Sequence, residues 1–362
     1  MSIFFKFLYI WLFYTISLFS LSLEDKYPSY AYVFDEFDVD ISYLYNDDFI
    51  DFVQENEDGL KKFYKRSLTR GESLLPMMQG LLVEDGVSDL FIYLSMIESG
   101  FSTNIVSPKK AAGLWQFMPA TARQYNLIVC KNYDERCNAV SATTAAMRYL
   151  TKLHKQFGKW YLAAMAYNCG EGCVQRAIKK AHTDDLAILT NNQTKYLPKE
   201  TRDYIRKILL IAMIGESSLI GFDEITQDDN GLIEVEITNT TSVTSVAKLI
   251  KMDSKKLLAL NAMYKNGILP KNKKYHKLII PIEKVYAFYL RYEMPIVKEV
   301  AQRAYIITHQ VKMGDSLESV AQLYDADKDE IRVANHLEYP FLHLESILVI
   351  PVSEKIFNQV SQ

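Results

Sequence analysis

Apolar residues recur at helical spacing through most of the first 220 residues of the chain. The periodic segments predict helices over residues 49–53, 74–82, 90–98, 145–157, 160–167 and 205–212. Gly100 and Gly158 are suited to left-handed helix ends, Pro198 to a first turn, and Ser141 to capping the helix after it. The pattern therefore predicts a mainly α-helical domain over residues 47–220.

The pattern changes after Gly221, where short β-like runs alternate with lysine-rich turns. Two segments of this part align 74 residues apart, so that Asn261 corresponds to Asn335. Each copy reads strand, helix, helix, strand and ends in an apolar run followed by proline. The repeat predicts two small α+β (βααβ) modules, at residues 234–282 and 305–352. The segment between them has a helical or linker-like composition and no assigned place.

The N-terminus carries a run of 17 uncharged residues, Phe7–Leu23. A basic start, an apolar middle and small residues near the end are typical of a secretory signal. We therefore expect residues 1–23 to be a signal peptide and the protein to be exported to the periplasm or cell envelope. The run also reaches the lower limit for a membrane span, so an uncleaved anchor that associates the protein with the membrane is the alternative. Residues 24–46 are expected to form an arm or linker.

The charge of the chain limits the kinds of molecule that the protein can bind. The net charge of −3 and the lack of a strongly basic stretch argue against nucleic acid as the main partner.

Export permits disulfides, and the four cysteines fall into two close pairs, Cys130/Cys137 and Cys169/Cys173. Four cysteines allow three pairings; we favour the two local ones. No histidine is spaced with them as a zinc finger needs, and no metal or cofactor is expected.

Glu98 is the first candidate for chemistry. It lies four residues after Leu94 and seven after Phe91, at the edge of the apolar stripe of its helix. A poorly solvated carboxyl keeps its proton to higher pH, which is how an enzyme makes a general acid near neutrality. The alternative is that Glu98 is a solvated glutamate beside a helix end. The residues around Glu98 must therefore decide between a general acid and an ordinary surface carboxylate.

Glu98 opens a series of four short motifs. They are Glu98-Ser99, Gly113-Leu114-Trp115-Gln116, Ala166-Tyr167-Asn168-x-Gly170 and Glu200-Thr201-x-x-Tyr204. Trp115 and Phe117 are expected to offer flat surfaces to a sugar ring, unless they are ordinary core residues. In this order the motifs resemble the lytic transglycosylase domain of bacterial cell-wall enzymes, a relative of goose-type lysozyme. The tryptophan in the second motif and its Gln-Phe-Met-Pro continuation look most like the murein transglycosylase D group.

The resemblance implies a lysozyme-like α-helical fold and cleavage of the β-1,4 bond between N-acetylmuramic acid and N-acetylglucosamine. It makes Glu98 the single general acid and base, which protonates the leaving oxygen and then takes the proton of the C6 hydroxyl as a 1,6-anhydro ring closes. It places six further residues along the substrate groove: Ser99, Gln116, Tyr167, Asn168, Glu200 and Tyr204. Of these, Tyr167 could donate a hydrogen bond to the sugar or orient Glu98, and Glu200 could contact substrate or only cap its helix.

The second C-terminal copy resembles a LysM module, which binds chains containing N-acetylglucosamine. The resemblance assigns glycan binding to Gly314, Asp315, Ser316 and Asn335. The first copy lacks the Gly-Asp pair and has Thr240-Thr241 instead, so it is a degenerate match that either binds glycan or is only structural. Peptidoglycan glycan strands are the implied partner. Two alternatives stay open: a lysozyme-type muramidase, in which water attacks, and a non-catalytic peptidoglycan-binding scaffold.

Overall fold

The computed structural model describes residues 22–218, 231–238, 241–271, 275–292, 305–335, 337, 342 and 346–360. The signal expected at residues 1–23 therefore lies outside the described residues, apart from its last two positions. Within the described ranges, the helices include none that is long and apolar enough to cross a membrane.

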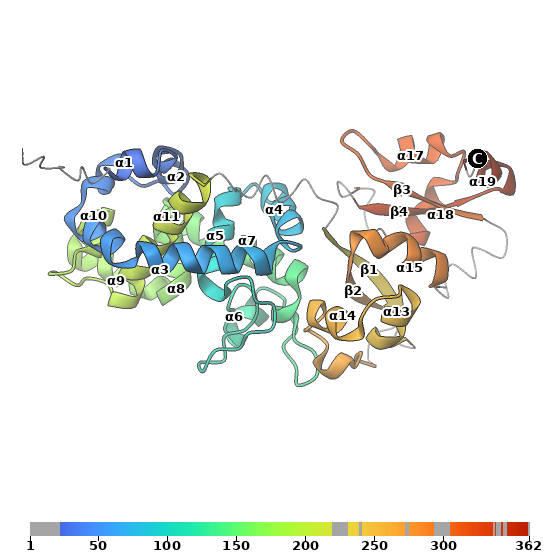
Figure 1. Cartoon of the computed structure of the whole chain (residues 1–362), viewed down its shortest axis with the longest axis horizontal. Helices are drawn as coiled ribbons and strands as arrows, with labels where there is room; N and C mark the ends of the chain where they lie inside the picture. Colours follow the sequence, from blue (N-terminus) through green and yellow to red (C-terminus); the bar gives the residue numbers. More distant parts are fainter. Residues whose placement is uncertain are drawn as a thin grey trace, which may run out of the picture.

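Residues 22–218 form a helical domain, drawn in blue to yellow-green in Figure 1. Its elements are α1 (Leu23–Lys26), α2 (Tyr30–Glu36), η1 (Ile41–Tyr45), α3 (Asp47–Gly71), α4 (Leu75–Glu84), η2 (Asp89–Phe91), α5 (Ile92–Ser99), α6 (Pro119–Gln124), η3 (Glu135–Cys137), α7 (Ala139–Phe157), α8 (Trp160–Cys169), α9 (Glu171–Ala181), α10 (Leu186–Thr190) and α11 (Lys199–Glu216). Helix α11 is buried along most of its length and packs against α2, α3, α5 and α8. The predicted mainly α-helical class is confirmed.

The ends of the helices follow the local sequence. Helix α5 stops at Gly100, whose φ of 57° is left-handed, and α7 stops at Gly158, whose φ is 73°. The prediction that Ser141 caps α7 was wrong, because the helix begins at Ala139. The Asn138 side-chain oxygen accepts the Ser141 backbone N–H at 2.8 Å and so performs the capping.

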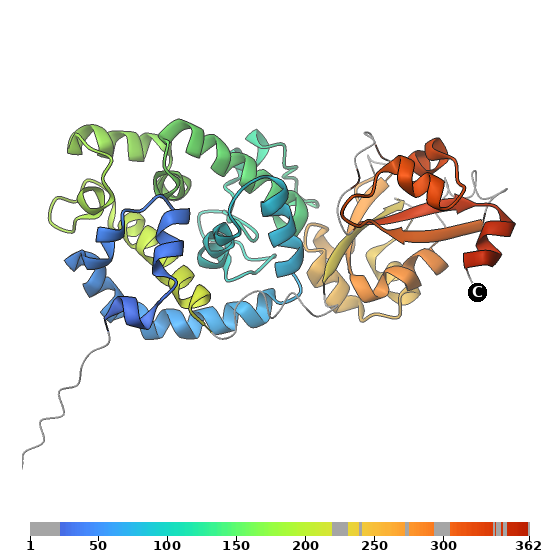
Figure 2. The same cartoon turned by 90° about the horizontal axis from the view of Figure 1, so that it is seen from above.

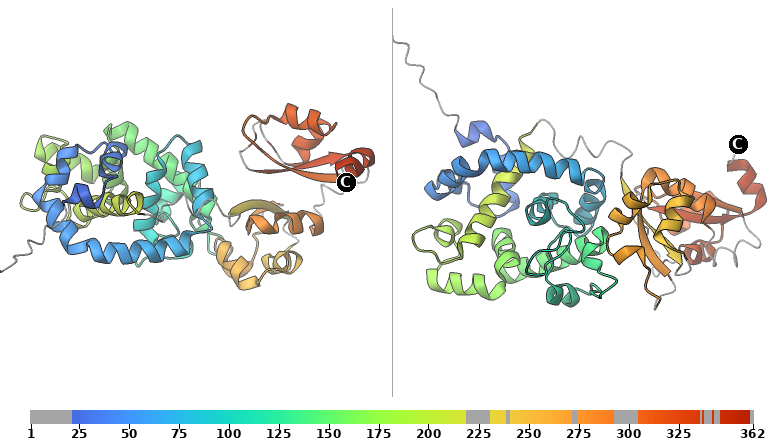
Figure 3. Two further views of the ribbon diagram at one scale, coloured as in Figure 1. Left: turned by 45° about the horizontal axis from the view of Figure 1, so that its top comes forward. Right: turned by 60° about the horizontal axis from the view of Figure 1, so that its bottom comes forward.

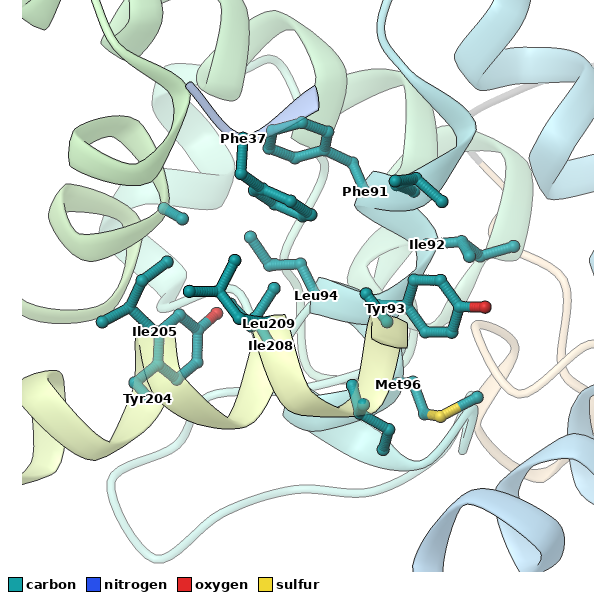
Figure 4. Packing of buried hydrophobic residues seen from close by; sticks show 14 of the residues in the cluster. Phe37, Phe91, Ile92, Tyr93, Leu94, Met96, Tyr204, Ile205, Ile208 and Leu209 are labelled. Carbon is teal, nitrogen blue, oxygen red and sulfur yellow. The ribbon is translucent and has the colours of Figure 1, made fainter. Parts of the chain in front are cut away.

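The segment expected to be an arm or linker packs into the core of the helical domain. Val33, Phe34 and Phe37 are fully buried, and the Phe37 ring lies 4.9 Å from that of Phe91, measured between centroids. Figure 4 shows Phe37 and Phe91 beside α5 and its contact with α11. Residues 24–46 therefore support the helix that carries Glu98.

Two small modules follow, each with one antiparallel pair of strands (Figures 1 and 2). The first contains β1 (Leu232–Thr238), α13 (Val243–Leu249), α14 (Ser254–Leu260), η4 (Lys265–Gly267), β2 (Tyr275–Pro281), η5 (Ile282–Lys284) and α15 (Val285–Arg291). The second contains β3 (Tyr305–Gln310), α17 (Leu317–Leu323), α18 (Lys328–Ala334), β4 (Ile347–Val352) and α19 (Glu354–Val360). Leu232 pairs with Pro281 in the first and Tyr305 with Val352 in the second.

Helix α15 belongs to the first module, because Val285 and Phe288 are buried in that module's core. The sequence had left this segment without a place. The side chains of Asn261 and Asn335 play the same part in the two modules. The amide N–H group of each donates to a carbonyl of the preceding helix and to a carbonyl of the last strand, and the amide oxygen accepts a backbone N–H of that strand. This shared brace explains why the two asparagines align.

The first module is docked on the helical domain. Tyr133 of that domain forms an isolated antiparallel bridge with Tyr264, and their ring centroids lie 5.3 Å apart. Ala112, Tyr133 and Cys137 share one buried cluster with the module's core. The views in Figure 3 show the gold and orange module against the teal segment of the helical domain. The two parts therefore share hydrophobic core and backbone hydrogen bonds.

Candidate active site

Glu98 lies at the end of α5 with a half-buried side chain. Burial raises the pKa of its carboxyl to about 7. The Tyr204 hydroxyl donates a 2.6 Å hydrogen bond to Glu98 Oε1, which lowers this pKa, and the charge of Glu200 raises it. Because burial is the largest of these effects, both protonation states of Glu98 are populated near neutral pH.

Helix α11 holds Tyr204 in place by burying the residues around it. Ile205, Ile208 and Leu209 are fully buried, and Figure 4 shows them between α11 and Leu94 of α5. The Glu98–Tyr204 hydrogen bond therefore joins two helices that are already packed together. Sequence reasoning placed Tyr204 in the groove but did not single it out as the partner of Glu98.

Tyr167 has a different partner from the one expected. Its hydroxyl donates a 2.7 Å hydrogen bond to the carbonyl of Trp115. Burial and the charge of Glu98 both raise the pKa of Tyr167, so the phenol stays protonated and keeps this bond. Ser95, on the same helix as Glu98, donates to the Leu114 carbonyl at 3.1 Å. The Gly-Leu-Trp-Gln loop is thus tied to α5, which carries Glu98, and to α8.

The expectation that Trp115 and Phe117 present flat surfaces to a sugar was wrong. Trp115 is fully buried and donates from its indole N–H to Thr143 Oγ1 at 2.9 Å. Phe117 is also buried and packs against Tyr167. Large apolar side chains in a loop gain more from burial than from exposure, so these two anchor the loop.

The other predicted groove residues have clear local contacts. Ser99 is buried and donates to the Ser95 carbonyl at 3.2 Å, within its own helix. Gln116 is half-buried and donates to the Gly113 carbonyl at 2.9 Å. Asn168 Oδ1 accepts from Thr201 at 2.9 Å and so joins α8 to the start of α11. Glu200 is exposed in the first turn of α11.

Arg136 holds the two ends of the segment around the Gly-Leu-Trp-Gln motif, and sequence reasoning missed it. Its buried guanidinium bonds Asp134 and donates to the carbonyls of Lys110 and Phe117, at 2.7 and 2.9 Å. A Cβ on Gly113 would lie 1.7 Å from the Arg136 carbonyl oxygen, so the loop can pass only because residue 113 is glycine. No short motif surrounds Arg136, and only tertiary contacts reveal its role.

The first module contacts the segment that carries Asp134 and Arg136 directly. The backbone N–H of Asp134 donates to the Met263 carbonyl, and that of Lys265 to the Asn132 carbonyl, both at 3.0 Å. Asp134 is the residue whose carboxylate holds Arg136. The first module therefore supports the segment that clamps the Gly-Leu-Trp-Gln loop.

One of the two favoured cysteine pairs forms. Cys169 and Cys173 are joined in a disulfide. The expected bond between Cys130 and Cys137 was wrong, because Cys137 is buried beneath the docked module, near Lys265, while Cys130 is exposed. The disulfide spans the turn that follows Asn168, where α8 gives way to α9.

The polar residues predicted to bind glycan in the second module are used within it. Asp315 accepts from the Lys312 backbone N–H and from His309, and Ser316 caps α17. Asn335 bonds Ile331 and Val349 as described above. Gly314 has a φ of 92°, which a residue with a side chain rarely adopts. These four residues therefore shape the loop ends of the module. Throughout the described ranges, no group of three or more His, Cys, Asp and Glu residues is arranged to hold a metal ion.

Family models match the helical domain and both C-terminal modules. The family described as Transglycosylase SLT domain matches residues 84–189. The family described as Lytic transglycosylase MltD, LysM-like domain matches residues 231–294, and LysM domain matches residues 309–351. The chain is homologous to membrane-bound lytic murein transglycosylase D, which confirms the resemblance seen in the motifs.

Two curated proteins are similar to parts of this chain. Membrane-bound lytic murein transglycosylase D of Escherichia coli K12 is 28% identical over 289 residues, which is 76% of this chain and 63% of the relative. The chain thus spans about 63% of the length of that relative. A putative tributyltin chloride resistance protein of Alteromonas is 43% identical over 86 residues, 24% of this chain and 42% of that protein.

Two solved structures are also similar. The lytic transglycosylase Slt of Pseudomonas aeruginosa is 26% identical, with a TM-score of 0.32, over 37% of this chain and 22% of that chain. The 70 kDa soluble lytic transglycosylase of Escherichia coli is 21% identical, with a TM-score of 0.30, over 35% of this chain and 21% of that chain.

Proposed function

We propose that this protein is a peptidoglycan lytic transglycosylase. It cleaves the β-1,4 bond between N-acetylmuramic acid and N-acetylglucosamine and leaves a 1,6-anhydro-N-acetylmuramic acid end. The observation that carries the proposal is the Glu98 carboxyl, half-buried, with a pKa of about 7 and a phenol bonded to it. The SLT domain and the homology to lytic murein transglycosylase D support the same reaction.

Glu98 acts twice in this reaction. Its protonated form gives a proton to the leaving glycosidic oxygen as the bond to the anomeric carbon breaks. The substrate's own acetamido group stabilises the positive charge at that carbon. The Glu98 carboxylate then takes the proton of the C6 hydroxyl while its oxygen closes the anhydro ring, which restores the acid. A pKa near 7 suits both steps, because neither form of the carboxyl is costly to reach.

Tyr204 is the positioning residue for both steps. Its hydroxyl donates to Oε1, so that Oε2 is the oxygen left to exchange protons with the substrate. Tyr167 and Arg136 act one step further away, by holding the loop that forms the wall next to Glu98.

The second module binds N-acetylglucosamine-containing chains and holds the enzyme on the wall, which its LysM match supports. Peptidoglycan strands are accordingly the partner, and the envelope is the location. The segment Phe7–Leu23 would direct export or anchor the protein at the membrane. The name of the Escherichia coli relative, membrane-bound, supports an envelope location.

Mass spectrometry of the products released from purified peptidoglycan tests the reaction. The expected products carry anhydro-muramic ends and are absent with Glu98→Gln. Products with ordinary reducing ends would instead identify a muramidase. A folded protein that binds the wall and releases nothing would identify a scaffold.

A further inference from the structure

A basic pocket of about 530 Å³ lies in the first module, between the end of α13 and the end of α15. The two helices pack against each other, and Figure 1 shows them in gold and orange. The pocket is lined by Thr241, Ser245, Lys248, Leu249, Lys251 and Arg291. Three of these six residues are cationic and none is acidic. The pocket takes no part in the proposed reaction, because it belongs to the module and not to the domain that carries Glu98.

The protein itself does not neutralise the charge of this pocket. The Arg291 guanidinium donates to the Leu249 carbonyl at 3.1 Å, and a carbonyl carries no net charge. Among the described residues, Lys248, Lys251 and Arg291 have no carboxylate partner. Cations that are grouped without a counter-charge repel one another. An anion bound between them would relieve that repulsion.

The repeat shows that the two lysines are not needed for the shape of the module. At the offset of 74 residues, Lys248 and Lys251 correspond to Gln322 and Asp325. The turn is the same in both copies, because Lys251 and Asp325 have left-handed φ values of 53° and 47° and each backbone N–H donates to the carbonyl three residues earlier. Lysines near a helix end can offset the helix dipole, yet the second copy forms this turn with a neutral and an acidic residue. The positive charge of the first copy therefore favours a role in binding over a role in folding.

The groups around the pocket suit a phosphate that is attached to a lipid. Thr241 and Ser245 add hydroxyl donors to the three cations, and a phosphate offers more acceptor oxygens than a carboxylate does. Leu290, directly before Arg291 at the end of α15, leaves 64% of its surface exposed. An exposed apolar side chain next to cations is typical of a protein surface that meets an anionic bilayer.

We propose that this pocket binds the phosphate headgroup of an anionic phospholipid, so that the first module contacts a membrane surface. The proposal depends neither on the proposed reaction nor on the segment Phe7–Leu23. Tyr264 and Lys265, which dock the module on the helical domain, are not among the residues that line the pocket. The lipid contact and the docking contact therefore use different residues of the module.

Titration calorimetry of the full-length protein with dihexanoyl phosphatidylglycerol, a phospholipid that is soluble as a monomer, tests the pocket. The pocket variant is Lys248→Gln, Lys251→Asn, in which Arg291 is kept and asparagine is chosen because it adopts a left-handed φ readily. The matched control is Lys255→Gln, Lys256→Gln, which removes the same charge from exposed lysines of α14, outside the pocket. We expect saturable binding by wild type and control, and an affinity at least about 10-fold lower in the pocket variant.

No saturable binding of this lipid by wild type, or the same affinity in wild type and pocket variant, would overturn the proposal. Inorganic phosphate is titrated in parallel and should bind at least about 10-fold more weakly than the lipid. Inorganic phosphate that bound as tightly as the lipid would refute the lipid as the ligand and leave a site for free phosphate. Binding of muramoyl tetrapeptide that the pocket variant alone loses, without lipid binding, would make the pocket a carboxylate site and would equally contradict the proposal.

Discussion

The hydroxyl of Tyr204 donates a 2.6 Å hydrogen bond to Oε1 of Glu98, joining the carboxyl at the end of α5 to the second turn of α11. Burial of Glu98 raises its pKa to about 7, and the hydrogen bond pulls in the opposite direction. The pKa of Glu98 is therefore set by tertiary effects of opposite sign, of which burial is the largest.

Glu98→Gln should abolish most turnover while the protein stays folded. The amide has nearly the same shape and cannot exchange a proton, so we expect kcat on soluble glycan to fall by about 100- to 10,000-fold. Glu55→Gln, an exposed change on α3, should leave kcat unaltered. A Glu98→Gln variant with more than a tenth of wild-type activity would show that another group is the acid.

Tyr204→Phe should move the pH dependence of kcat/KM. Without the donated hydrogen bond, which lowers the pKa of Glu98, that pKa rises above about 7, so the limb that reports it shifts to higher pH. Tyr167→Phe is the matched control, because it removes a bond to the Trp115 carbonyl and not one to Glu98. If the two variants had the same pH profile, the hydrogen bond from Tyr204 would not be what lowers the pKa of Glu98.

The stability of the protein should also depend on Glu98. Its folded pKa of about 7 lies above the ordinary value of 4.5, so the folded state binds the proton more tightly than the unfolded state. The stability contribution is complete below pH 4.5 and is lost as pH rises through 7. Glu98→Gln has no such loss, so its free energy of unfolding relative to wild type should rise with pH, by up to about 3 kcal/mol. Denaturant unfolding at pH 5 and pH 8 measures this, and a difference that did not change with pH would contradict the burial of the carboxyl.

The two C-terminal modules should behave differently when removed. A chain lacking residues 305–362 should bind insoluble peptidoglycan less well and turn over soluble glycan like the full chain. Removing residues 231–362 should cost at least about 10-fold in that turnover, because it uncovers Tyr133 and releases the segment that holds Arg136.

Single substitutions in the full chain refine this comparison. Tyr264→Ala removes the ring that packs on Tyr133 and should lower turnover and thermal stability. Tyr286→Ala, at an exposed position of the same module, should change neither. If deletion of both modules left soluble turnover intact, the docked module would serve only for attachment.

The cysteines give a simple chemical check. Under non-reducing conditions the folded protein should react with a thiol reagent once, at exposed Cys130, and a second time at Cys137 only after unfolding. Reduction should then expose Cys169 and Cys173. Intact-mass measurement at the three stages distinguishes this from two local disulfides, which would give no label before reduction.

The sequence by itself determined much of the local structure and the candidate chemistry. Apolar spacing of 3.6 residues and glycines suited to left-handed ends, such as Gly100 and Gly158, set the helices. The four motifs were enough to select Glu98 as the candidate acid, and the 74-residue repeat identified the two modules. All of these are properties of neighbours along the chain, so they can be read without a structure.

Only the tertiary structure decided which of these residues face each other. In the folded protein Trp115 is a core residue, and Cys130 and Cys137 are unpaired. The hydrogen-bond donor to Glu98 is Tyr204 rather than Tyr167. The tertiary structure also docked the first module on the segment that carries Arg136. These outcomes depend on burial and on contacts between segments far apart in sequence, whose free energies arise only once the helices pack. The spacing of residues along the chain does not show which distant segments will come into contact.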